Sequence, residues 1–229
     1  MHKYAIILAG GKGVRMGAPM PKQFLLLGGK PLLMLTLEIF HNADPNIEII
    51  LVLPESQQEY WRDLCQQYDF KIKYQIANGG NNRFESVQNG LALIGEDGLV
   101  AVHDGVRPFI NAGLIERCYS AAAQFGACVP VILLTESIRK LEGETSFSVH
   151  RETFRFVQTP QTFQTAILKK AYQIPYSEAF TDDASVVEAV GIKVEMTEGC
   201  AENIKITSPL DLLMAEQMIK LNPDLLKKC

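Results

Sequence analysis

The sequence predicts an α/β fold in which a mostly parallel sheet is covered by helices on both faces. Short runs of apolar and β-branched residues alternate with longer stretches whose apolar residues recur at helical spacing. The apolar runs are nearly continuous, as strands buried on both faces require. No repeat, linker or low-complexity segment interrupts the 229 residues, so we expect a single domain spanning 1–229.

The first 133 residues supply this alternation. Segment 71–77 alternates apolar and polar residues and predicts a strand near the sheet edge. The other predicted strands are 4–9, 47–54, 98–105 and 126–133. The predicted helices are 32–43, 57–68, 83–94 and 112–125.

The alternation breaks after Leu134. Residues 136–160 alternate at period two around a turn at Gly143, which predicts a β-hairpin that projects as an arm over roughly 136–158. A helix over 163–173 follows, and then a helix capped by Thr181. The chain closes with predicted strands 193–199 and 203–207 and a helix 209–220, with Pro209 in its first turn.

Composition excludes several functional classes. A net charge of -4 argues against a nucleic-acid binder that relies on a basic surface. No apolar run approaches the ~18 residues of a membrane span, and segment 4–9 is too short for a signal-peptide core. The five cysteines are scattered and contain no CxxC pair, which is typical of reduced thiols. We therefore expect a cytoplasmic protein that is complete from Met1.

Glycines and cations are concentrated after the first predicted strand. Residues 10–22 hold four glycines and three cations: Gly10, Gly11, Gly13, Gly17, Lys12, Arg15 and Lys22. Such a loop lets backbone N–H groups approach phosphate. No Gly-Lys-Ser/Thr follows, and prolines occupy the place where a dinucleotide-binding helix would begin. The pattern favours a long loop around a nucleoside triphosphate; the alternative is an ordinary turn with solvated cations.

The stretch "VHDGVRPF" places Asp104 at the carboxyl end of a buried strand, where open α/β sheets bind ligands. A carboxylate there can hold Mg²⁺ among phosphate oxygens. His103 is either a ligand or, more commonly for a lone histidine, a structural residue. Arg107 is either an anion contact or the partner of a nearby carboxylate.

Two further stretches place polar groups near strand ends. "NGGNNRFES" carries Gly79, Gly80 and Ser86 and either shapes a base pocket or forms an ordinary strand-to-helix turn. "ENIKIT" carries Lys205 within an apolar strand, where it needs an anionic partner unless it points to solvent.

Together these stretches resemble the 2-C-methyl-D-erythritol 4-phosphate cytidylyltransferase family. The matching pieces occur in the family's order: "LAGGKGVRMG", "PKQF", "NGGNNRFESV", "VHDGVRPF", "VQTPQTF", "TDDASVVE" and "NIKIT". The resemblance implies a Rossmann-like nucleotidyltransferase fold and a homodimer whose arms interlock. It also implies CTP and a small polyol phosphate as substrates, with Mg²⁺ or another divalent cation.

The resemblance implies catalytic roles at matching positions. Arg15 and Lys22 would stabilise charge on the α-phosphate of CTP. Lys205 would bridge the phosphates of nucleotide and acceptor, and Asp104 would lie near the metal ion. Arg151 would position the acceptor, partly from the partner subunit.

The binding residues are implied in the same way. The nucleotide would be lined by Ala9, Gly10, Gly11, Lys12, Gly13, Gly80, Asn81 and Ser86. The acceptor would be bound by Asp104, Arg107, Ser137 and Thr181. The sequence departs from the common pattern at Ser137, where threonine is common, at Gly105 and Val106, where alanines are frequent, and at Asn81, where an acidic residue is frequent.

Two other functions are weighed against this one. A pentitol-phosphate cytidylyltransferase, such as one acting on ribitol 5-phosphate, shares the "PKQF" style of motif; "TDDASVVE" and "NIKIT" favour methylerythritol phosphate. A non-catalytic nucleotide-binding protein would be expected to lose Arg15, Lys22, Asp104 or Lys205, and all four are present.

Overall fold

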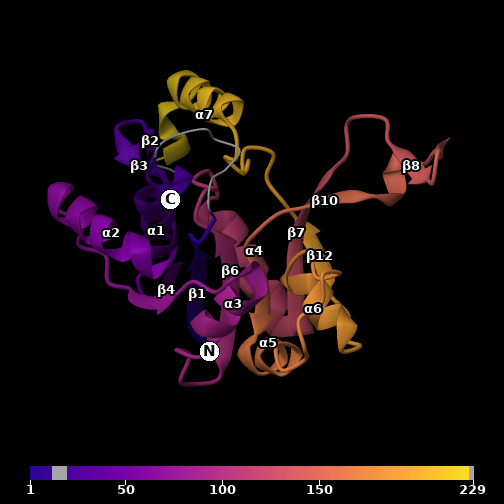
Figure 1. The fold of residues 1–229 in the computed structure, drawn as a ribbon, viewed down its shortest axis with the longest axis horizontal. Helices are drawn as coiled ribbons and strands as arrows, with labels where there is room; N and C mark the ends of the chain where they lie inside the picture. The colour runs from indigo at the N-terminus through magenta and orange to yellow at the C-terminus, as the bar shows by residue number, and fades with distance from the viewer. Residues whose placement is uncertain (12–19, 227–229) are drawn as a thin grey trace.

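An eight-stranded mixed sheet forms the centre of the computed structural model, which describes residues 1–11 and 20–226 (Figure 1). Its strands run in the order β10-β7-β11-β6-β1-β4-β5, and β12 also pairs with β7. They are β1 (His2–Leu8), β4 (Glu48–Leu53), β5 (Gln75–Asn78), β6 (Gly98–Asp104), β7 (Ala127–Leu133), β10 (Arg155–Val157), β11 (Gln161–Gln164) and β12 (Glu195–Glu198). Strands β6, β1, β4 and β5 are mutually parallel, as the alternation predicts.

Seven α-helices accompany the sheet in the described ranges. They are α1 (Leu32–Ala43), α2 (Glu55–Gln67), α3 (Arg83–Leu91), α4 (Ala112–Phe125), α5 (Thr165–Ala171), α6 (Asp183–Ala189) and α7 (Pro209–Leu221). Helices α1 and α4 coincide with their predicted ranges, and Pro209 opens α7. Helix α3 ends at Leu91, three residues before its predicted end.

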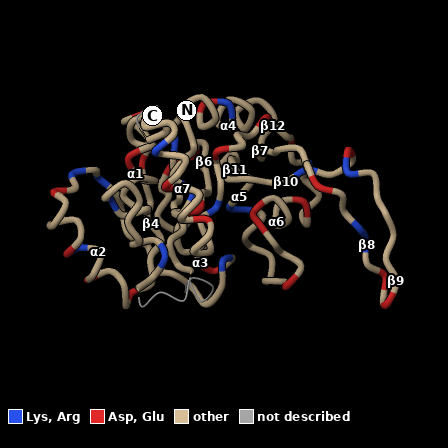
Figure 2. Tube along the Cα trace, turned by 90° about the horizontal axis from the view of Figure 1, so that it is seen from above, with Lys and Arg blue, Asp and Glu red and all other residues tan. Residues whose placement is uncertain are grey.

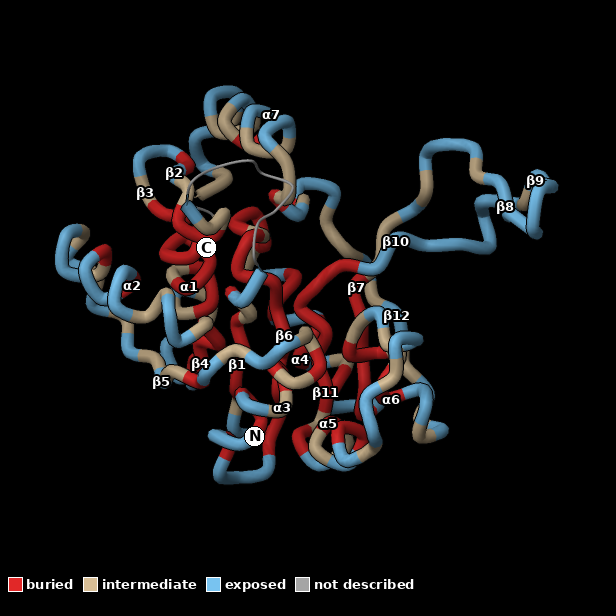
Figure 3. Tube along the Cα trace, viewed as in Figure 1, coloured by how far each residue is buried: buried red, intermediate tan, exposed pale blue. Residues whose placement is uncertain are grey.

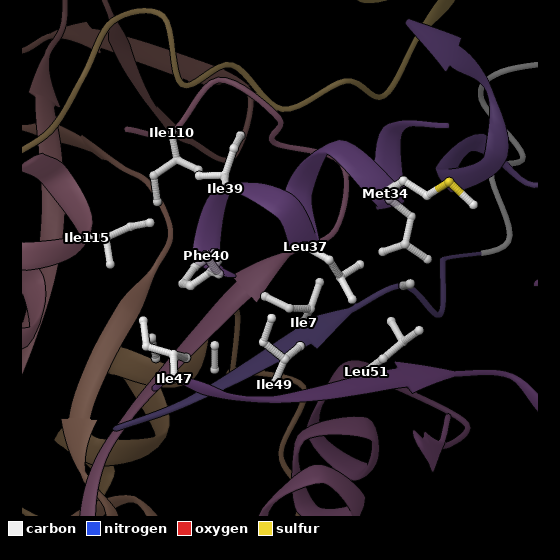
Figure 4. Close-up of a cluster of buried hydrophobic side chains, with 14 of the residues drawn as sticks. Ile7, Met34, Leu37, Ile39, Phe40, Ile47, Ile49, Leu51, Ile110 and Ile115 are labelled. Carbon is white, nitrogen blue, oxygen red and sulfur yellow. The ribbon is translucent and has the colours of Figure 1, made fainter. Parts of the chain in front are cut away.

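Alternate residues of each central strand belong to two separate hydrophobic cores, one on each face of the sheet. On one face Ala5, Ile7 and Leu51 pack with residues of α1, α2 and α4. Figure 4 shows part of this core, with Ile7 and Leu37 pointing toward each other. On the other face Ile6 and Val52 pack with residues of α3, α5 and α6. This period of two, on strands buried on both faces, explains their unbroken apolar sequence. A third, smaller core joins α7 to the start of α1.

The predicted hairpin is present as β8 (Arg139–Glu142) and β9 (Thr145–Ser148), which pair around Gly143 at a positive φ of 57°. Figures 1 and 2 show it projecting from the body, and the colouring of Figure 3 shows that most of its residues are exposed. The last part of the expected arm belongs to the main sheet, because β10 pairs antiparallel with β7.

Four local predictions are wrong, three of them on helices and strands and one on a helix cap. The helix expected from residue 163 begins at Thr165, because Gln161–Gln164 forms strand β11, antiparallel to both β6 and β7. Residues 71–74 lie outside β5. Residues 203–207 are not a strand; Ile206 N–H bonds to Val106 O at 3.0 Å, but no ladder of such bonds forms along the described segment. Each of these outcomes depends on pairing between distant segments, which local periodicity does not encode.

Thr181 does not cap α6. The N-cap is Asp182, whose carboxylate accepts from Ser185 N–H at 2.9 Å while the Ser185 hydroxyl lies 3.2 Å from Asp182 N–H. This reciprocal capping box satisfies two backbone donors. Thr181 is exposed one residue earlier.

Candidate active site

A cavity of about 470 Å³ lies where β1, β5 and β6 end, together with the loop that carries Lys205. That volume is in the range typical of small-ligand sites. The structure brings nine predicted residues to its wall: Ala9, Gly10, Gly11, Lys22, Gly80, Asn81, Ser86, Asp104 and Lys205. The rest of the lining is Leu8, Gln23, Asn82, Arg83 and Val106. Predicted residues Lys12, Gly13 and Arg15 lie outside the described residues.

The start of the glycine-rich loop is fixed to the body by backbone and amide bonds. Ala9 N–H donates to Val52 O at 2.9 Å, which continues the direction of β1. Gln23 Nε2 donates to Ala9 O at 2.7 Å and to Gln57 Oε1 at 2.6 Å. Gln23 is buried and was not predicted as a site residue. Its position within the motif "PKQF" was the feature of the sequence that could have identified it as a site residue. Its hydrogen-bond partners Ala9 and Gln57 are distant in sequence, so the bonds themselves could not be predicted.

Lys22 reaches the cavity across Gly11. A Cβ at Gly11 would lie 3.3 Å from Lys22 Cε and 3.7 Å from Lys22 Nζ. The first of these separations is tighter than ordinary van der Waals contact. The missing side chain therefore leaves room for the lysine to lie against the loop backbone.

A second part of the cavity wall is the turn between β5 and α3. A Cβ at Gly80 would lie 2.3 Å from Glu85 Cβ, so this turn requires glycine. The Ser86 hydroxyl accepts from Gly80 N–H at 3.0 Å and donates to Asn82 O at 2.8 Å. Asn81 donates from both its backbone N and Nδ2 to Glu85 Oε2, each at 2.8 Å. The turn is thus held in shape by its own side chains.

Asp104 is the anionic centre of the site. Its Oδ2 lies 3.1 Å from Lys205 Nζ and 3.0 Å from Arg107 Nε. Burial by itself would raise the pKa of Asp104, but the charges of Lys205, Arg107 and Arg83 hold that pKa well below its usual range. The carboxylate is therefore ionised at neutral pH, and both ion pairs end on Oδ2 rather than Oδ1.

The structure gives the protein contacts of Arg107 and His103, the two residues that the sequence left open. Arg107 is a carboxylate partner, and its second contact is Asn203 O at 2.8 Å; it does not line the cavity. His103 is structural: Nε2 lies 3.3 Å from Arg107 O, and Nδ1 lies 3.0 Å from Thr159 Oγ1. Burial lowers the pKa of His103 to about 4, so the ring is neutral at pH 7.

Arg83 is a cavity residue that the sequence did not reveal. Its guanidinium makes a two-point ion pair with the buried Asp183, at 2.8 Å and 2.5 Å, and Tyr172 donates to the same carboxylate at 2.6 Å. An arginine in the first turn of a helix opposes the helix dipole. This unfavourable placement of a positive charge was the feature of the sequence that could have identified Arg83, since it indicates an acidic partner from another segment.

Of the residues predicted to bind or position the acceptor, Asp104 lines the cavity, whereas Ser137, Thr181 and Arg151 do not. Ser137 and Arg151 are exposed in the arm segment, where Arg151 donates to Thr135 O. Thr181 is exposed just before α6. None of the three is among the residues that line the cavity of the described chain.

Asp104 is the one carboxylate among the described residues that line the cavity, and it is the candidate ligand for a divalent cation. Across residues 1–11 and 20–226, no group of three or more His, Cys, Asp or Glu side chains could hold a metal ion. Mg²⁺ typically binds one or two carboxylates and completes its shell with substrate phosphates and water. The ionised Asp104 fits a metal bound in this way.

The four described cysteines are free thiols, and no helix in the described ranges is long and apolar enough to cross a membrane.

Comparison with known proteins gives concordant matches. A family profile for 2-C-methyl-D-erythritol 4-phosphate cytidylyltransferase matches residues 3–221. The enzyme of that name from Phocaeicola vulgatus is 53% identical over 219 residues, covering 96% of this chain and 100% of its own. The one from Porphyromonas gingivalis is 48% identical, covering 95% and 97%.

Solved structures agree with these matches. The 2-C-methyl-D-erythritol 4-phosphate cytidylyltransferase from Thermus thermophilus has a TM-score of 0.78 at 34% identity, covering 96% of this chain and 100% of its own. The 4-diphosphocytidyl-2C-methyl-D-erythritol synthase from Anaerococcus prevotii has a TM-score of 0.82 at 26% identity, with 95% of each chain covered. The fold is thus the nucleotidyltransferase fold that the resemblance implies.

Proposed function

The chain belongs to the 2-C-methyl-D-erythritol 4-phosphate cytidylyltransferase family, and we propose that its cavity transfers the cytidylyl group of CTP to 2-C-methyl-D-erythritol 4-phosphate. The products are 4-diphosphocytidyl-2-C-methyl-D-erythritol and pyrophosphate, in the non-mevalonate route to isoprenoids. The observation that carries the proposal is the cavity wall itself, which combines a glycine-rich loop, Lys22, Lys205 and an ionised Asp104.

The nucleotide side of the proposal rests on two walls. The N–H groups of Gly10 and Gly11 would meet the triphosphate, because they follow the end of β1 with no side chain in the way. Ala9 would line the same wall, with its own N–H bonded to Val52 O. The turn of Gly80 and Asn81 would face cytosine and ribose. Lys12 and Gly13 are proposed to extend the first wall on sequence grounds.

The chemistry needs cations rather than a base. A phosphate oxygen of the acceptor attacks the α-phosphorus of CTP; the new P–O bond forms as the bond to the β-phosphate oxygen breaks, and pyrophosphate leaves. A phosphate nucleophile is already ionised at neutral pH, so no side chain has to remove a proton. Lys22 and Arg15 would stabilise charge on the α-phosphate, and Lys205 would draw the acceptor phosphate toward it.

Asp104 would hold Mg²⁺ or another divalent cation. When bound, the ion would neutralise charge on the phosphate oxygens. Before substrate arrives, Lys205 Nζ occupies one side of the carboxylate, at 3.1 Å from Oδ2. We propose that substrate phosphates share this lysine with Asp104, while Arg107 keeps the carboxylate oriented from below the cavity wall.

The acceptor residues on the arm would act in a homodimer. Arg151 and Ser137 lie away from their own cavity, so they would serve the partner's site when two arms interlock. The exposed apolar side chains of the arm segment and its base support a contact with a second copy: Leu141, Phe147, Phe154, Phe156 and Val157. Thr181 is proposed as a further acceptor contact. A cytoplasmic location and a lack of nucleic-acid binding remain predictions from the sequence.

The test is product formation by the purified protein. With CTP, 2-C-methyl-D-erythritol 4-phosphate and Mg²⁺, we expect pyrophosphate release and a product whose mass equals the acceptor plus a cytidylyl group. Omitting the acceptor or chelating the metal is expected to stop the reaction. CTP binding without product under all these conditions would contradict the proposal.

A further inference from the structure

The loop that carries Lys205 is fastened to the base of the arm by two buried amide side chains. We propose that Gln158 and Asn203 are positioning residues that hold this loop so that Lys205 meets the Asp104 carboxylate. The inference rests on the proposed function for its catalytic consequence, while the anchoring itself is a property of the fold.

Gln158 acts as a backbone partner for Cys200. Its Nε2 donates to Cys200 O at 2.8 Å, and its Oε1 accepts from Cys200 N–H at 3.0 Å. The side chain is 4% exposed, and its own N–H is fixed to Pro130 O at 2.8 Å. A Cβ at Gly199 would lie 2.6 Å from Gln158 Oε1, so glycine makes room for the amide. The Gln158 amide thus makes one donor and one acceptor bond to the backbone of Cys200, as a neighbouring strand would, and joins the loop to the residue that follows β10.

Asn203 continues the anchor two residues before Lys205. It is fully buried, and its Nδ2 donates to Thr159 O at 2.8 Å. Its backbone oxygen accepts from Arg107 at 2.8 Å, the same guanidinium that pairs with Asp104. The Thr159 hydroxyl in turn accepts from Asp104 N–H at 3.2 Å. Arg107 and Thr159 therefore each contact both Asn203 and Asp104.

Lys205 needs such an anchor because its segment lacks a strand ladder. On its far side, Ile206 N–H bonds to Val106 O at 3.0 Å. Its own side chain is 41% exposed and long, so the path of the loop sets the volume that Nζ can reach. A displacement near 1 Å can cost about 100-fold in rate when a group must meet a developing charge.

The Asn203 side chain can be replaced to test the anchor, because one of its two polar atoms, Oδ1, has no hydrogen-bond donor among the described residues. Replacing asparagine by leucine removes the unsatisfied Oδ1 and also the bond to Thr159 O, which becomes the unsatisfied acceptor in its place, so the number of unsatisfied acceptors does not rise. Asn203→Leu is expected to keep the fold while loosening the loop.

The experiment compares Asn203→Leu and Gln158→Met with Tyr119→Phe. The control also removes a buried side-chain bond to a backbone oxygen, Tyr119 to Tyr4 at 2.7 Å, in the amino-terminal half of β1 and outside the cavity lining. Amide exchange, followed by mass spectrometry over residues 200–207, is expected to rise about tenfold or more in the two test variants and to stay unchanged in the control. With both substrates saturating, kcat is expected to fall about 10- to 100-fold in the test variants alone.

A double-mutant cycle tells positioning from general damage. In a Lys205→Ala background, Asn203→Leu is expected to lower kcat less than twofold further, because the lysine it positions is gone. Unchanged exchange over 200–207 would overturn the anchoring. Faster exchange with wild-type kcat, or an undiminished loss in the Lys205→Ala background, would overturn the link to Lys205. If the wild-type protein forms no product, the proposed function fails while the exchange data still decide the anchoring.

Discussion

Removing Arg83 is expected to destabilise the protein more than removing the charge of its partner Asp183. The two side chains are bonded at two points, yet they differ in burial: Asp183 is 0% exposed and Arg83 is 32% exposed at the side chain. Arg83→Met strands a fully buried carboxylate, which costs about 3–5 kcal/mol. Asp183→Asn leaves a cation that water reaches in part, and it keeps an acceptor for Tyr172, so we expect a cost of about 1–2 kcal/mol.

Urea unfolding near neutral pH measures these costs. In the double variant the stranded charge is absent, so Arg83→Met is expected to cost at least about 2 kcal/mol less in the Asp183→Asn background than in the wild type. Equal single-variant losses, a reversed order, or a coupling below about 0.5 kcal/mol would refute the asymmetry argued from burial.

Three further outcomes are expected. Lys22→Ala and Arg15→Ala should each lower kcat for pyrophosphate release by at least about 100-fold, whereas the exposed Lys71→Ala should not; a near-normal kcat would remove that residue from the proposed role. Between pH 7 and pH 5 the free energy of unfolding should fall by about 2 kcal/mol through His103, because the unfolded ring (pKa 6.5) binds a proton that the buried ring (pKa about 4) does not. Urea unfolding with metal chelated should show this slope flattened in His103→Asn, and an equal slope would contradict the assignment. Replacing 139–148 by a short Gly-Ser linker should give a monomer by light scattering, and a persistent dimer would show that the arm does not make the contact.

The sequence predicted the parts of the fold that local pattern determines. The apolar run of β1 and the helical spacing of α1 and α4 depend on burial of one segment at a time. Strand β11 was missed because four residues, mostly polar, become a strand through pairing with β6 and β7 on either side. The path of 203–207 was missed for the same kind of reason.

In the site, too, features set by local pattern were predicted and features set by pairing between distant segments were not. Asp104 was placed correctly, because the end of an apolar strand is visible in the sequence. Arg107 is three residues from Asp104 and was weighed from the sequence as the partner of a nearby carboxylate. The pairing of Lys205 with Asp104 and of Asp183 with Arg83 was not visible, since the members of each pair are about 100 residues apart along the chain. Burial and pairing across such separations decide which charged residues share a cavity, and a single sequence does not report them.

The most direct measurement of the central claim is acceptor choice. Purified protein, Mg²⁺ and CTP are given 2-C-methyl-D-erythritol 4-phosphate in one series and D-ribitol 5-phosphate in the other, and kcat/KM for pyrophosphate release is compared. The proposal predicts a strong preference, at least about 100-fold, for the methylerythritol phosphate. Equal use of both acceptors, or preference for ribitol 5-phosphate, would keep the nucleotide site but contradict the assigned reaction.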